Sequence, residues 1–314
     1  MPARADLIPD AFRARVAGRP ADADGGIDGD TWLASLPRLL DECLSTWKAQ
    51  PEGPTAFGEC ALVVPVRVGK ERAALKVTWP HAEARHEHLA LRAWRGTGAV
   101  RMRAADPARW ALLLERCEPA VRLHEMSALD ACEMIGLIHA RLTHPALPQL
   151  DTASAWCARI RERLESSPPP MPRRFVQQGI ALARDLPQAD RIDATLVHCD
   201  LHDDNVMQTR RAGTVDGFVA IDPKPVAGEP ALAVAPLLWN RWDEAAGAYN
   251  LRNHLRFRVD YACDPMGVAP ERARAWSILR LLDNAWWDAH AALRPGAAAP
   301  DLTKAVSIIK AMQG

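Results

Sequence analysis

Two runs of apolar residues near position 60 predict the first regular structure in the chain. CALVVPVRV at 60–68 and RAALKVTW at 72–79 are rich in β-branched and other apolar residues, and the turn GKE separates them, which predicts an antiparallel hairpin. Apolar residues then recur at helical spacing up to a glycine, which predicts a helix at about 82–95. WALLLE at 110–115 predicts another buried strand, so this part of the chain forms a small sheet with one main helix.

After residue 118 the pattern changes from strands to helices. A proline run at 168–170 separates two of the helix-length apolar segments. The predicted helices lie at 128–142, 153–164, 173–186, 270–291 and about 302–312. Short apolar runs also predict strands at 195–198 and 218–221, with 206–207 pairing near them.

This order of elements predicts an α+β protein with two lobes. A chain of 314 residues exceeds the usual size of a single hydrophobic core. We therefore assign residues 1–117 to a small N-terminal lobe built on an antiparallel sheet, and residues 118–314 to a larger, mostly helical C-terminal lobe. Residues 1–30, rich in Ala, Asp, Gly and Arg, are expected to form a loosely held or short-helical lead-in. Two lobes leave room for a ligand-binding cleft.

Charge and composition favour a small-molecule partner in the cytoplasm. The chain has 39 basic and 39 acidic residues, so its net charge gives no sign of a nucleic-acid or membrane partner. We find neither an apolar run of about 20 residues that would span a membrane nor a signal-peptide core. Seven cysteines without paired CxxC spacing argue against a disulfide framework or a structural zinc site. The oligomeric state stays open.

The stretch HCDLHDDNVM at 198–207 concentrates polar side chains between two predicted strands. In phosphoryl transfer, an Asp accepts the proton of the acceptor hydroxyl, and an Asn five residues later binds the metal that neutralises phosphate charge. Asp200 and Asn205 have this spacing. Asp222, seventeen residues after Asn205, ends an apolar strand and is suited to bind Mg²⁺ together with phosphate oxygens. The three residues predict one catalytic and metal-binding site.

A lysine inside an apolar strand predicts a second part of this site. Burying the ammonium of Lys76 is costly unless anions neutralise it. Glu87 on the predicted helix can supply a carboxylate, and Glu83, one helical turn earlier, is the alternative partner. Phosphates would supply the remaining negative charge. The small-residue turn that contains Phe57 and Gly58 could fold over those phosphates, although it lacks a GxGxxG motif.

These features also have simpler explanations and other functional interpretations. A single lysine in a strand is more often an edge residue than a ligand, and an Asp-rich loop is more often a solvated turn. A nucleotide-binding pseudoenzyme is expected to have lost part of the catalytic set. A metal-dependent hydrolase is the other alternative, and its metal ligands would be His198, Asp200, His202 and Asp203. That interpretation leaves Lys76 and Asp222 unexplained, which favours a kinase.

Longer segments of the sequence resemble a known family. LVHCDLHDDNVM and AIDPKPVAGEPALAVAPLLWN, with FGECALVVPVR and LLLERCEP upstream, are similar to aminoglycoside/hydroxyurea antibiotic-resistance kinases of the streptomycin 6-phosphotransferase type. The resemblance covers about residues 55–290 and implies a protein-kinase-like fold and ATP-dependent phosphorylation of an alcohol group. The residue roles that it implies are Asp200 as catalytic base, Asn205 and Asp222 as Mg²⁺ ligands, Lys76 with Glu87 on the phosphates, and Glu115, Arg116 and Cys117 as the adenine-binding linker.

The sequence departs from the family pattern at two positions. Cys199 stands where the family commonly has glycine, and Ala233 stands where it often has aspartate. Because the predicted base and metal ligands are present, we expect the chemistry to be retained.

Candidates for binding the acceptor lie beside the predicted base and on the last long helix. Tryptophans on a helix belong to a core more often than to a site. Acidic side chains suit a cationic aminocyclitol, and they equally suit a neutral sugar through hydrogen bonds. Together with the resemblance, they favour a streptomycin-like aminoglycoside. The candidates are Asp203, Asp204, Asp283, Trp287 and Asp288.

Overall fold

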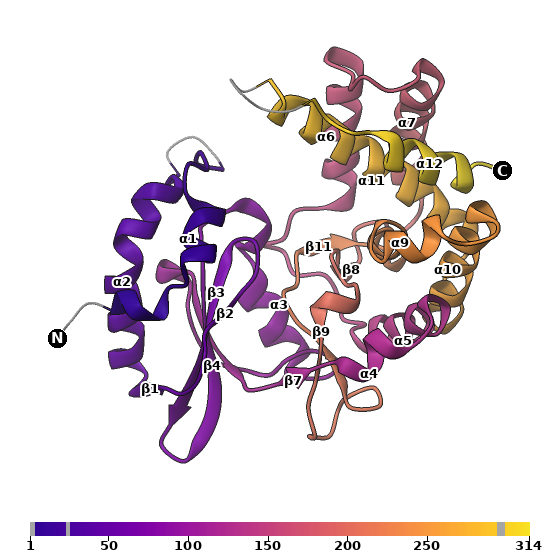
Figure 1. The fold of residues 1–314 in the computed structure, drawn as a ribbon. Helices are drawn as coiled ribbons and strands as arrows, with labels where there is room; N and C mark the ends of the chain where they lie inside the picture. Colours follow the sequence, from indigo (N-terminus) through magenta and orange to yellow (C-terminus); the bar gives the residue numbers. More distant parts are fainter. Residues whose placement is uncertain (1–3, 23–25, 294–298) are drawn as a thin grey trace.

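The computed structural model describes residues 4–22, 26–293 and 299–314, and its elements form two lobes (Figure 1). The sheet lobe runs from a 3-10 helix at Arg4–Leu7 to strand β6 at Ala111–Glu115. The helical lobe begins at strand β7, Glu118–Pro119. The predicted α+β architecture, with a small antiparallel sheet followed by a mostly helical lobe, is confirmed.

One antiparallel sheet organises the sheet lobe. Its strands are β1 Ala49–Pro51, β2 Ala56–Phe57, β3 Ala61–Val68, β4 Glu71–Thr78, β5 Met102–Asp106 and β6. Their order is β1-β3-β4-β6-β5, and β2 pairs with the other end of β3. The predicted hairpin is β3–β4, paired over its full length. The predicted strand at 110–115 is β6, which starts one residue later because Trp110 has a left-handed backbone with φ of 54°.

Among its described residues, the sheet lobe contains three α-helices, not the one main helix expected. They are α1 Asp10–Val16, α2 Gly29–Thr46 and α3 Glu87–Trp94. The helix predicted at 82–95 is divided into a 3-10 turn at Ala82–Ala84 and α3. Figure 1 shows α1 and α2 on the outer side of this lobe and α3 on the side that faces the helical lobe.

Within the lead-in predicted at 1–30, residues 4–22 and 26–30 are described, and they are packed rather than loosely held. Phe12 and Val16 of α1 are fully buried in a core that they share with α2 and the sheet, so only the short-helical alternative agrees with the structure. Helix α2 was not predicted, yet its start is capped, because the carboxylate of Asp28 accepts a hydrogen bond from the N–H of Thr31 at 2.8 Å.

Strand β4 separates two environments, because successive side chains of a strand point to opposite faces of the sheet. Leu75 and Val77 belong to the apolar core beneath α1 and α2. Lys76, between them in the sequence, faces the other side and contacts Glu87 of α3. The alternation therefore directs one charged side chain away from the core and toward the second lobe.

Helices predominate in the helical lobe. They are α4 Val121–Glu125, α5 Ala128–Arg141, α6 Ala153–Ser166, α7 Arg173–Asp185, α8 Pro236–Trp239, α9 Trp242–Ala246, α10 Leu251–Met266, α11 Pro270–Ala291 and α12 Thr303–Met312. The five predicted helices correspond to α5, α6, α7, α11 and α12. Helix α10, which packs along α5, was missed although both ends carry signals. Asn250 caps its start, and Gly267 follows its end with φ of 62°.

Two short sheets hold the segment between α7 and α8. Strand β8 pairs antiparallel with β11, and β9 lies between β7 and β10. Their bounds are β8 Thr195–His198, β9 Val206–Gln208, β10 Phe218–Ala220 and β11 Pro225–Gly228. The three short strands predicted from the sequence are β8, β9 and β10. These sheets fix the ends of the two loops that contain Asp200 and Asp222.

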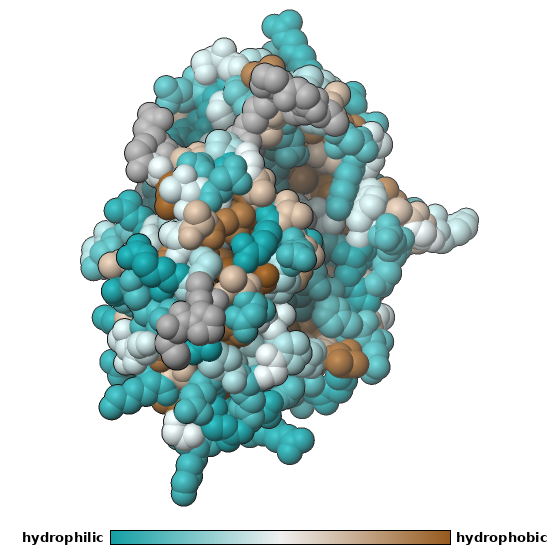
Figure 2. Space-filling view, turned by 60° about the vertical axis from the view of Figure 1, so that its left-hand side comes forward, coloured by the Kyte–Doolittle hydropathy of each residue, from teal (hydrophilic) through white to brown (hydrophobic). Residues whose placement is uncertain are grey.

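Across the described ranges, no helix is both long and apolar enough to cross a bilayer. The view with the sheet lobe turned forward shows a mainly hydrophilic surface with a shaded recess beside that lobe (Figure 2).

Candidate active site

The loop after β8 places Asp200 beside the paired strand β11. The backbone N–H of Cys199 donates to the carbonyl of Lys224 at 3.2 Å, which continues the β8–β11 pairing past the strand end. His198 contributes from within β8: its Nδ1 accepts the N–H of Asp200 at 3.2 Å, and its Nε2 donates to the carbonyl of Ile221 at 2.9 Å. Both ring nitrogens are therefore engaged in holding the loop.

Burial keeps the imidazole of His198 neutral. It lowers the pKa of this histidine from its ordinary value to about 4, since a charged ring would be separated from water. A neutral ring can accept at one nitrogen and donate at the other, as the two hydrogen bonds require. His198 is therefore a structural support for the catalytic loop.

Asn205 is oriented by the backbone of the same loop. Its Nδ2 donates to the carbonyl of Asp200 at 2.7 Å, which turns the amide oxygen Oδ1 away from that carbonyl. The backbone carbonyl of Asn205 accepts the N–H of Ile221 at 2.9 Å, so the residue before Asp222 is anchored to it. Asp222 itself has a left-handed backbone, with φ of 54°. The structure thus brings the two predicted metal ligands onto neighbouring backbone segments.

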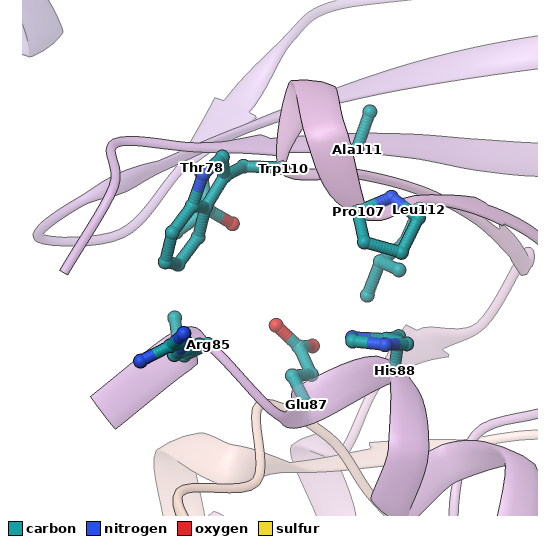
Figure 3. A pocket seen from close by; sticks show the side chains of 9 residues that line it. Thr78, Arg85, Glu87, His88, Pro107, Trp110, Ala111 and Leu112 are labelled. Atoms are coloured by element: carbon teal, nitrogen blue, oxygen red, sulfur yellow. The ribbon is translucent and has the colours of Figure 1, made fainter. Parts of the chain in front are cut away.

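Lys76 lies at the centre of a group of ion pairs that joins the lobes. Its Nζ is 2.8 Å from both carboxylate oxygens of Glu87 and 2.5 Å from Oδ1 of Asp222. Lys76 and Glu87 are 5% and 3% exposed, so this is a buried cation with two counter-ions. The predicted pairing with Glu87 is present, and the alternative with Glu83 is wrong. Figure 3 shows Glu87 pointing from the start of α3 into a small pocket, opposite Thr78 and Leu112 of the sheet.

Burial and neighbouring charges have opposing effects on the pKa values of Lys76, Glu87 and Asp222. Burial lowers the pKa of Lys76, but the carboxylates of Asp222 and Glu87 raise it by more, so the lysine stays charged. Lys76 in turn lowers the pKa of Asp222 to about 2. Burial raises the pKa of Glu87 above its ordinary value, and Lys76 opposes this effect only in part. Asp222 is therefore the more firmly ionised partner of the lysine.

Lys224 is a member of the site that the sequence interpretation missed. Its Nζ lies 2.8 Å from Oδ2 of Asp200 and 3.2 Å from Oε2 of Glu83. Glu83 therefore does contribute a carboxylate near the site, but to a different lysine from the one expected. The available signal was position, because Lys224 stands two residues after Asp222 in IDPK.

In the predicted adenine-binding linker and the predicted phosphate turn, some side chains are used in contacts within the protein. The carboxylate of Glu115 accepts hydrogen bonds from Nε of Arg211 at 2.8 Å and from the backbone N–H of Arg101 at 2.7 Å. Phe57 packs its ring against Phe12 of α1, with centroids 5.6 Å apart. Where these segments meet a nucleotide, they would therefore offer backbone groups. Arg116 is half-buried and Cys117 is buried beside Glu115, while a side chain at Gly58 would meet nothing within 4 Å.

The acceptor candidates of the catalytic loop have different environments. Asp203 is buried, with Nε of Arg241 at 3.7 Å and Nδ1 of His124 at 3.9 Å. Asp204 is exposed, and ring nitrogens of His202 and His124 lie 3.8 and 4.0 Å from its carboxylate. Asp204 is therefore the carboxylate of this pair that is accessible to a ligand.

The candidates on α11 form a separate cluster with α6. Asp283 is buried and accepts hydrogen bonds from Nη1 of Arg163 and Nε1 of Trp156, each at 2.8 Å. The guanidinium of Arg163 lies 4.7 Å from the ring centroid of Trp287, which is 53% exposed. Asp288 is exposed, and partial burial raises the pKa of its carboxyl. Within the described residues, no hydrogen bond or ion pair joins this cluster to Asp203 or Asp204.

The hydrolase alternative lacks a suitable ligand set. Both ring nitrogens of His198 are engaged with the backbone, and Asp203 pairs with a guanidinium. Over the parts of the chain that the structure describes, no group of three or more His, Cys, Asp or Glu side chains is arranged to hold a metal ion. The hard oxygen donors of Asn205 and Asp222 instead suit Mg²⁺ shared with phosphate oxygens.

Comparison of the sequence with known proteins supports the kinase interpretation. The family model described as aminoglycoside/hydroxyurea antibiotic resistance kinase matches residues 46–291. Streptomycin 6-kinase of Streptomyces glaucescens is 33% identical over 298 residues, which is 92% of this chain and 93% of that protein. Hydroxyurea phosphotransferase of Kitasatospora aureofaciens is 33% identical over 273 residues, 84% of this chain and 76% of that protein.

Solved structures show the same fold at much lower identity. The aminoglycoside phosphotransferase APH(4)-Ia has a TM-score of 0.54 at 15% identity, over 88% of this chain and 99% of its own. A choline/ethanolamine kinase family protein from Mesorhizobium loti has a TM-score of 0.55 at 14% identity, over 87% and 93% of the two chains. The two-lobe, kinase-like fold predicted from the sequence is confirmed.

Proposed function

Because the chain belongs to the aminoglycoside/hydroxyurea antibiotic resistance kinase family, we propose that it transfers the γ-phosphoryl group of ATP to a hydroxyl group of a small polar acceptor. The observation that carries this proposal is the group of ion pairs around Lys76 that links both lobes. Lys76 of the sheet lobe contacts Asp222 of the helical lobe, and Asn205 and Asp200 lie on the adjoining backbone. Positioning and charge stabilisation of this kind supply most of the catalysis in phosphoryl transfer.

Asp200 is proposed as the catalytic base. A carboxylate base is useful where a hydroxyl proton must be lost as the phosphorus–oxygen bond forms. Three contacts hold Asp200: its N–H donates to His198, its carbonyl accepts from Asn205, and its Oδ2 is paired with Lys224. The two backbone contacts thus fix the loop of the base before any ligand arrives, which reduces the reorganisation needed in the transition state.

Asn205 and Asp222 are proposed as ligands of Mg²⁺. The amide oxygen of Asn205 is turned away from the loop carbonyl that its Nδ2 contacts. Asp222 is ionised, with its pKa lowered by Lys76 to about 2, and only Oδ1 is used by the lysine. Mg²⁺ prefers such oxygen ligands and, when bound, would supply charge neutralisation of the phosphate oxygens. In this arrangement Lys76 orients the phosphates, and Glu87 positions Lys76.

The nucleotide is proposed to bind between the lobes. Glu115, Arg116 and Cys117, at the passage from β6 to β7, would contact the adenine through backbone groups, and the backbone at Phe57 and Gly58 would cover the phosphates. Because the reaction consumes ATP, we place the protein in the cytoplasm.

We propose a streptomycin-type aminocyclitol as the acceptor. The relatives named streptomycin 6-kinase cover most of the chain, and the exposed carboxylate of Asp204 would attract a cation near the base. Asp288 and the exposed indole of Trp287 are proposed as an outer part of the acceptor site. Asp203 and Asp283, whose carboxylates are already paired with arginines, would act by fixing the walls of the site.

The test is ATP-dependent phosphorylation of a panel of acceptors. The enzyme, Mg²⁺ and ATP are incubated with streptomycin, other aminoglycosides, hydroxyurea and glucosamine, and products are analysed by mass spectrometry while ADP is measured in a coupled assay. We expect streptomycin to gain one phosphoryl group. Phosphorylation of hydroxyurea or glucosamine alone would keep the kinase and reject the aminocyclitol, whereas a chain that neither binds Mg·ATP nor forms ADP would overturn the proposal.

A further inference from the structure

In the function proposed so far, Lys224 serves only as one of the contacts of the proposed base. Among the described residues it is the only cation paired with Asp200, at 2.8 Å, and it also reaches Glu83 at 3.2 Å. Asp200 belongs to the helical lobe and Glu83 to the sheet lobe. One ammonium therefore joins the two lobes at the point where the acceptor hydroxyl would meet the phosphoryl group.

The pairing of Lys224 with Asp200 works against proton transfer to this carboxylate, because an ammonium beside a carboxylate favours its ionised form. Loss of this contact would therefore help the proposed base to accept a proton. A buried or half-buried cation also needs a partner when it moves. Glu83 is already within 3.2 Å, so the ammonium can leave Asp200 without being left unpaired.

The backbone fixes Lys224 relative to the rest of the site. Its carbonyl accepts the N–H of Cys199, and the next residue, Pro225, is paired with His198 in the β8–β11 sheet. Lys224 also follows the proposed metal ligand Asp222 by two residues. The same short ladder thus positions the base, the metal ligand and this ammonium. Its ammonium lies between the carboxylates of Asp200 and Glu83.

The composition of the chain makes a lysine here significant. The sequence contains 33 arginines and only 6 lysines. Two of those six, Lys76 and Lys224, lie within this site, and each contacts two carboxylates. An ammonium is a compact point charge on a flexible stem, whereas a guanidinium is a rigid planar fork. A chain that uses arginine nearly everywhere else has an ammonium at both of these positions, where a cation lies between two carboxylates.

We propose that Lys224 is a second phosphate-binding lysine of the enzyme. When Mg·ATP and the acceptor bind, its ammonium exchanges Asp200 for an oxygen of the γ-phosphoryl group, and Glu83 holds it there. This inference rests on the proposed function. During transfer, the bond between the acceptor oxygen and the γ-phosphorus forms while the bond from that phosphorus to the β,γ-bridging oxygen breaks. The hydroxyl proton passes to Asp200, ADP keeps the electron pair of the broken bond, and Lys224 keeps its proton and stabilises the phosphoryl oxygens.

The test compares nucleotides with and without a γ-phosphate. Lys224→Met removes the charge while nearly keeping the side-chain length. Isothermal titration of the full chain with Mg·AMP-PNP and Mg·ADP should show the affinity for Mg·AMP-PNP falling about tenfold, while that for Mg·ADP stays within about twofold. Turnover with an acceptor that the wild-type enzyme phosphorylates should fall about 10²-fold or more. The proposal would be overturned by an equal loss of affinity for both nucleotides, by no loss of affinity for either, or by unchanged or faster turnover. A lysine that only neutralises Asp200 would not distinguish the two nucleotides.

Three further variants separate charge, position and folding. Lys70→Met makes the same change in the exposed β3–β4 turn and should alter neither affinity nor turnover. Lys224→Arg keeps the charge and should retain much of the preference for Mg·AMP-PNP. Glu83→Gln leaves the lysine in place and should lower turnover several-fold with Mg·ADP affinity unchanged; unchanged turnover would contradict the positioning role. This variant also decides the matter if Lys224→Met does not fold.

The titrations distinguish this inference from the proposed function. If the wild-type chain binds Mg·AMP-PNP but phosphorylates no acceptor in the panel, the aminocyclitol proposal fails while the comparison of the two nucleotides still tests Lys224. If the wild-type chain binds no Mg·nucleotide, both proposals fail.

Discussion

Nζ of Lys76 lies 2.5 Å from Oδ1 of Asp222, although the two residues are 146 positions apart in the sequence. The contact joins β4 of the sheet lobe to the loop after β10 of the helical lobe. It also places the proposed phosphate-binding lysine against the proposed metal ligand. Replacing either residue therefore removes a charge partner from the other.

Replacing Asp222 should alter the requirement for Mg²⁺. Asp222→Ala removes a carboxylate from the proposed metal site and one of the two counter-ions of Lys76. We expect weaker Mg·ATP binding together with turnover reduced by about 10²-fold or more. The measurement is turnover as a function of Mg²⁺ concentration, with the exposed Asp190→Ala as control. An unchanged Mg²⁺ dependence would show that Asp222 is only the structural end of a strand.

Replacing Lys76 alone should lower stability more than replacing Lys76 and Glu87 together. Lys76→Met removes the partner of a buried carboxylate, which costs about 3 to 5 kcal/mol, and it removes the charge that orients the phosphates. We expect both activity and the unfolding temperature to fall. The double variant Lys76→Met with Glu87→Gln should recover much of the unfolding temperature but not the activity. If the single variant is as active as the wild type, the phosphate-binding role is wrong.

Removing the proposed base should separate binding from chemistry. Asp200→Ala leaves Lys224 paired with Glu83, so the loop keeps its cation in a neutralised position. We expect nucleotide affinity close to that of the wild type and acceptor-dependent turnover reduced by about 10²-fold or more, since the proton is accepted only at the chemical step. Calorimetry and the coupled assay measure the two quantities. Turnover equal to that of the wild type would reject the assignment.

Two buried histidines should make stability depend on pH. His139 of α5 and His198 have ring centroids 6.3 Å apart, and burial lowers their pKa values to about 3 and about 4. Because both folded-state pKa values lie below the ordinary value of 6.5, the unfolded chain binds these protons more readily. The stability that neutral rings contribute is complete above pH 6.5 and is lost as the pH falls toward 4.

The variant His139→Leu tests this dependence. It removes one titrating ring, whose Nε2 is buried without a hydrogen-bond partner among the described residues. Its stability relative to the wild type should rise by about 2 kcal/mol between pH 7.5 and pH 5. Thermal unfolding of both proteins across this range is the measurement. A stability difference that stays constant with pH would mean that His139 does not titrate as expected.

Cys199→Gly should preserve activity and lower stability. The family resemblance implies glycine at this position, but Cys199 does not adopt a left-handed backbone, so glycine would relieve no strain there. The thiol is buried, and its removal leaves a small cavity and a more flexible loop, which costs about 1 to 2 kcal/mol. We expect turnover near that of the wild type and a lower unfolding temperature. Complete loss of turnover would reveal a role for the thiol.

The sequence by itself determined the type of fold and most of the proposed site. The hairpin around Lys76 and the loop HCDLHDDN were predictable because strand alternation and the five-residue spacing of Asp200 and Asn205 are local properties of the chain. Helix α10 was equally predictable, since Asn250 and Gly267 mark its ends, but the helical pattern between them was missed. Helix α2 likewise carries its own cap at Asp28.

Only the tertiary structure decided which charges meet. Glu87 was the predicted partner of Lys76, and Glu83, one helical turn earlier, was the alternative. The helix is interrupted between them, so they point to different lysines. Lys224 reaches Asp200 because β11 folds back beside β8. A buried ion pair depends on the relative placement of elements distant in sequence. That placement results from packing of the whole chain, and no local pattern of residues records it.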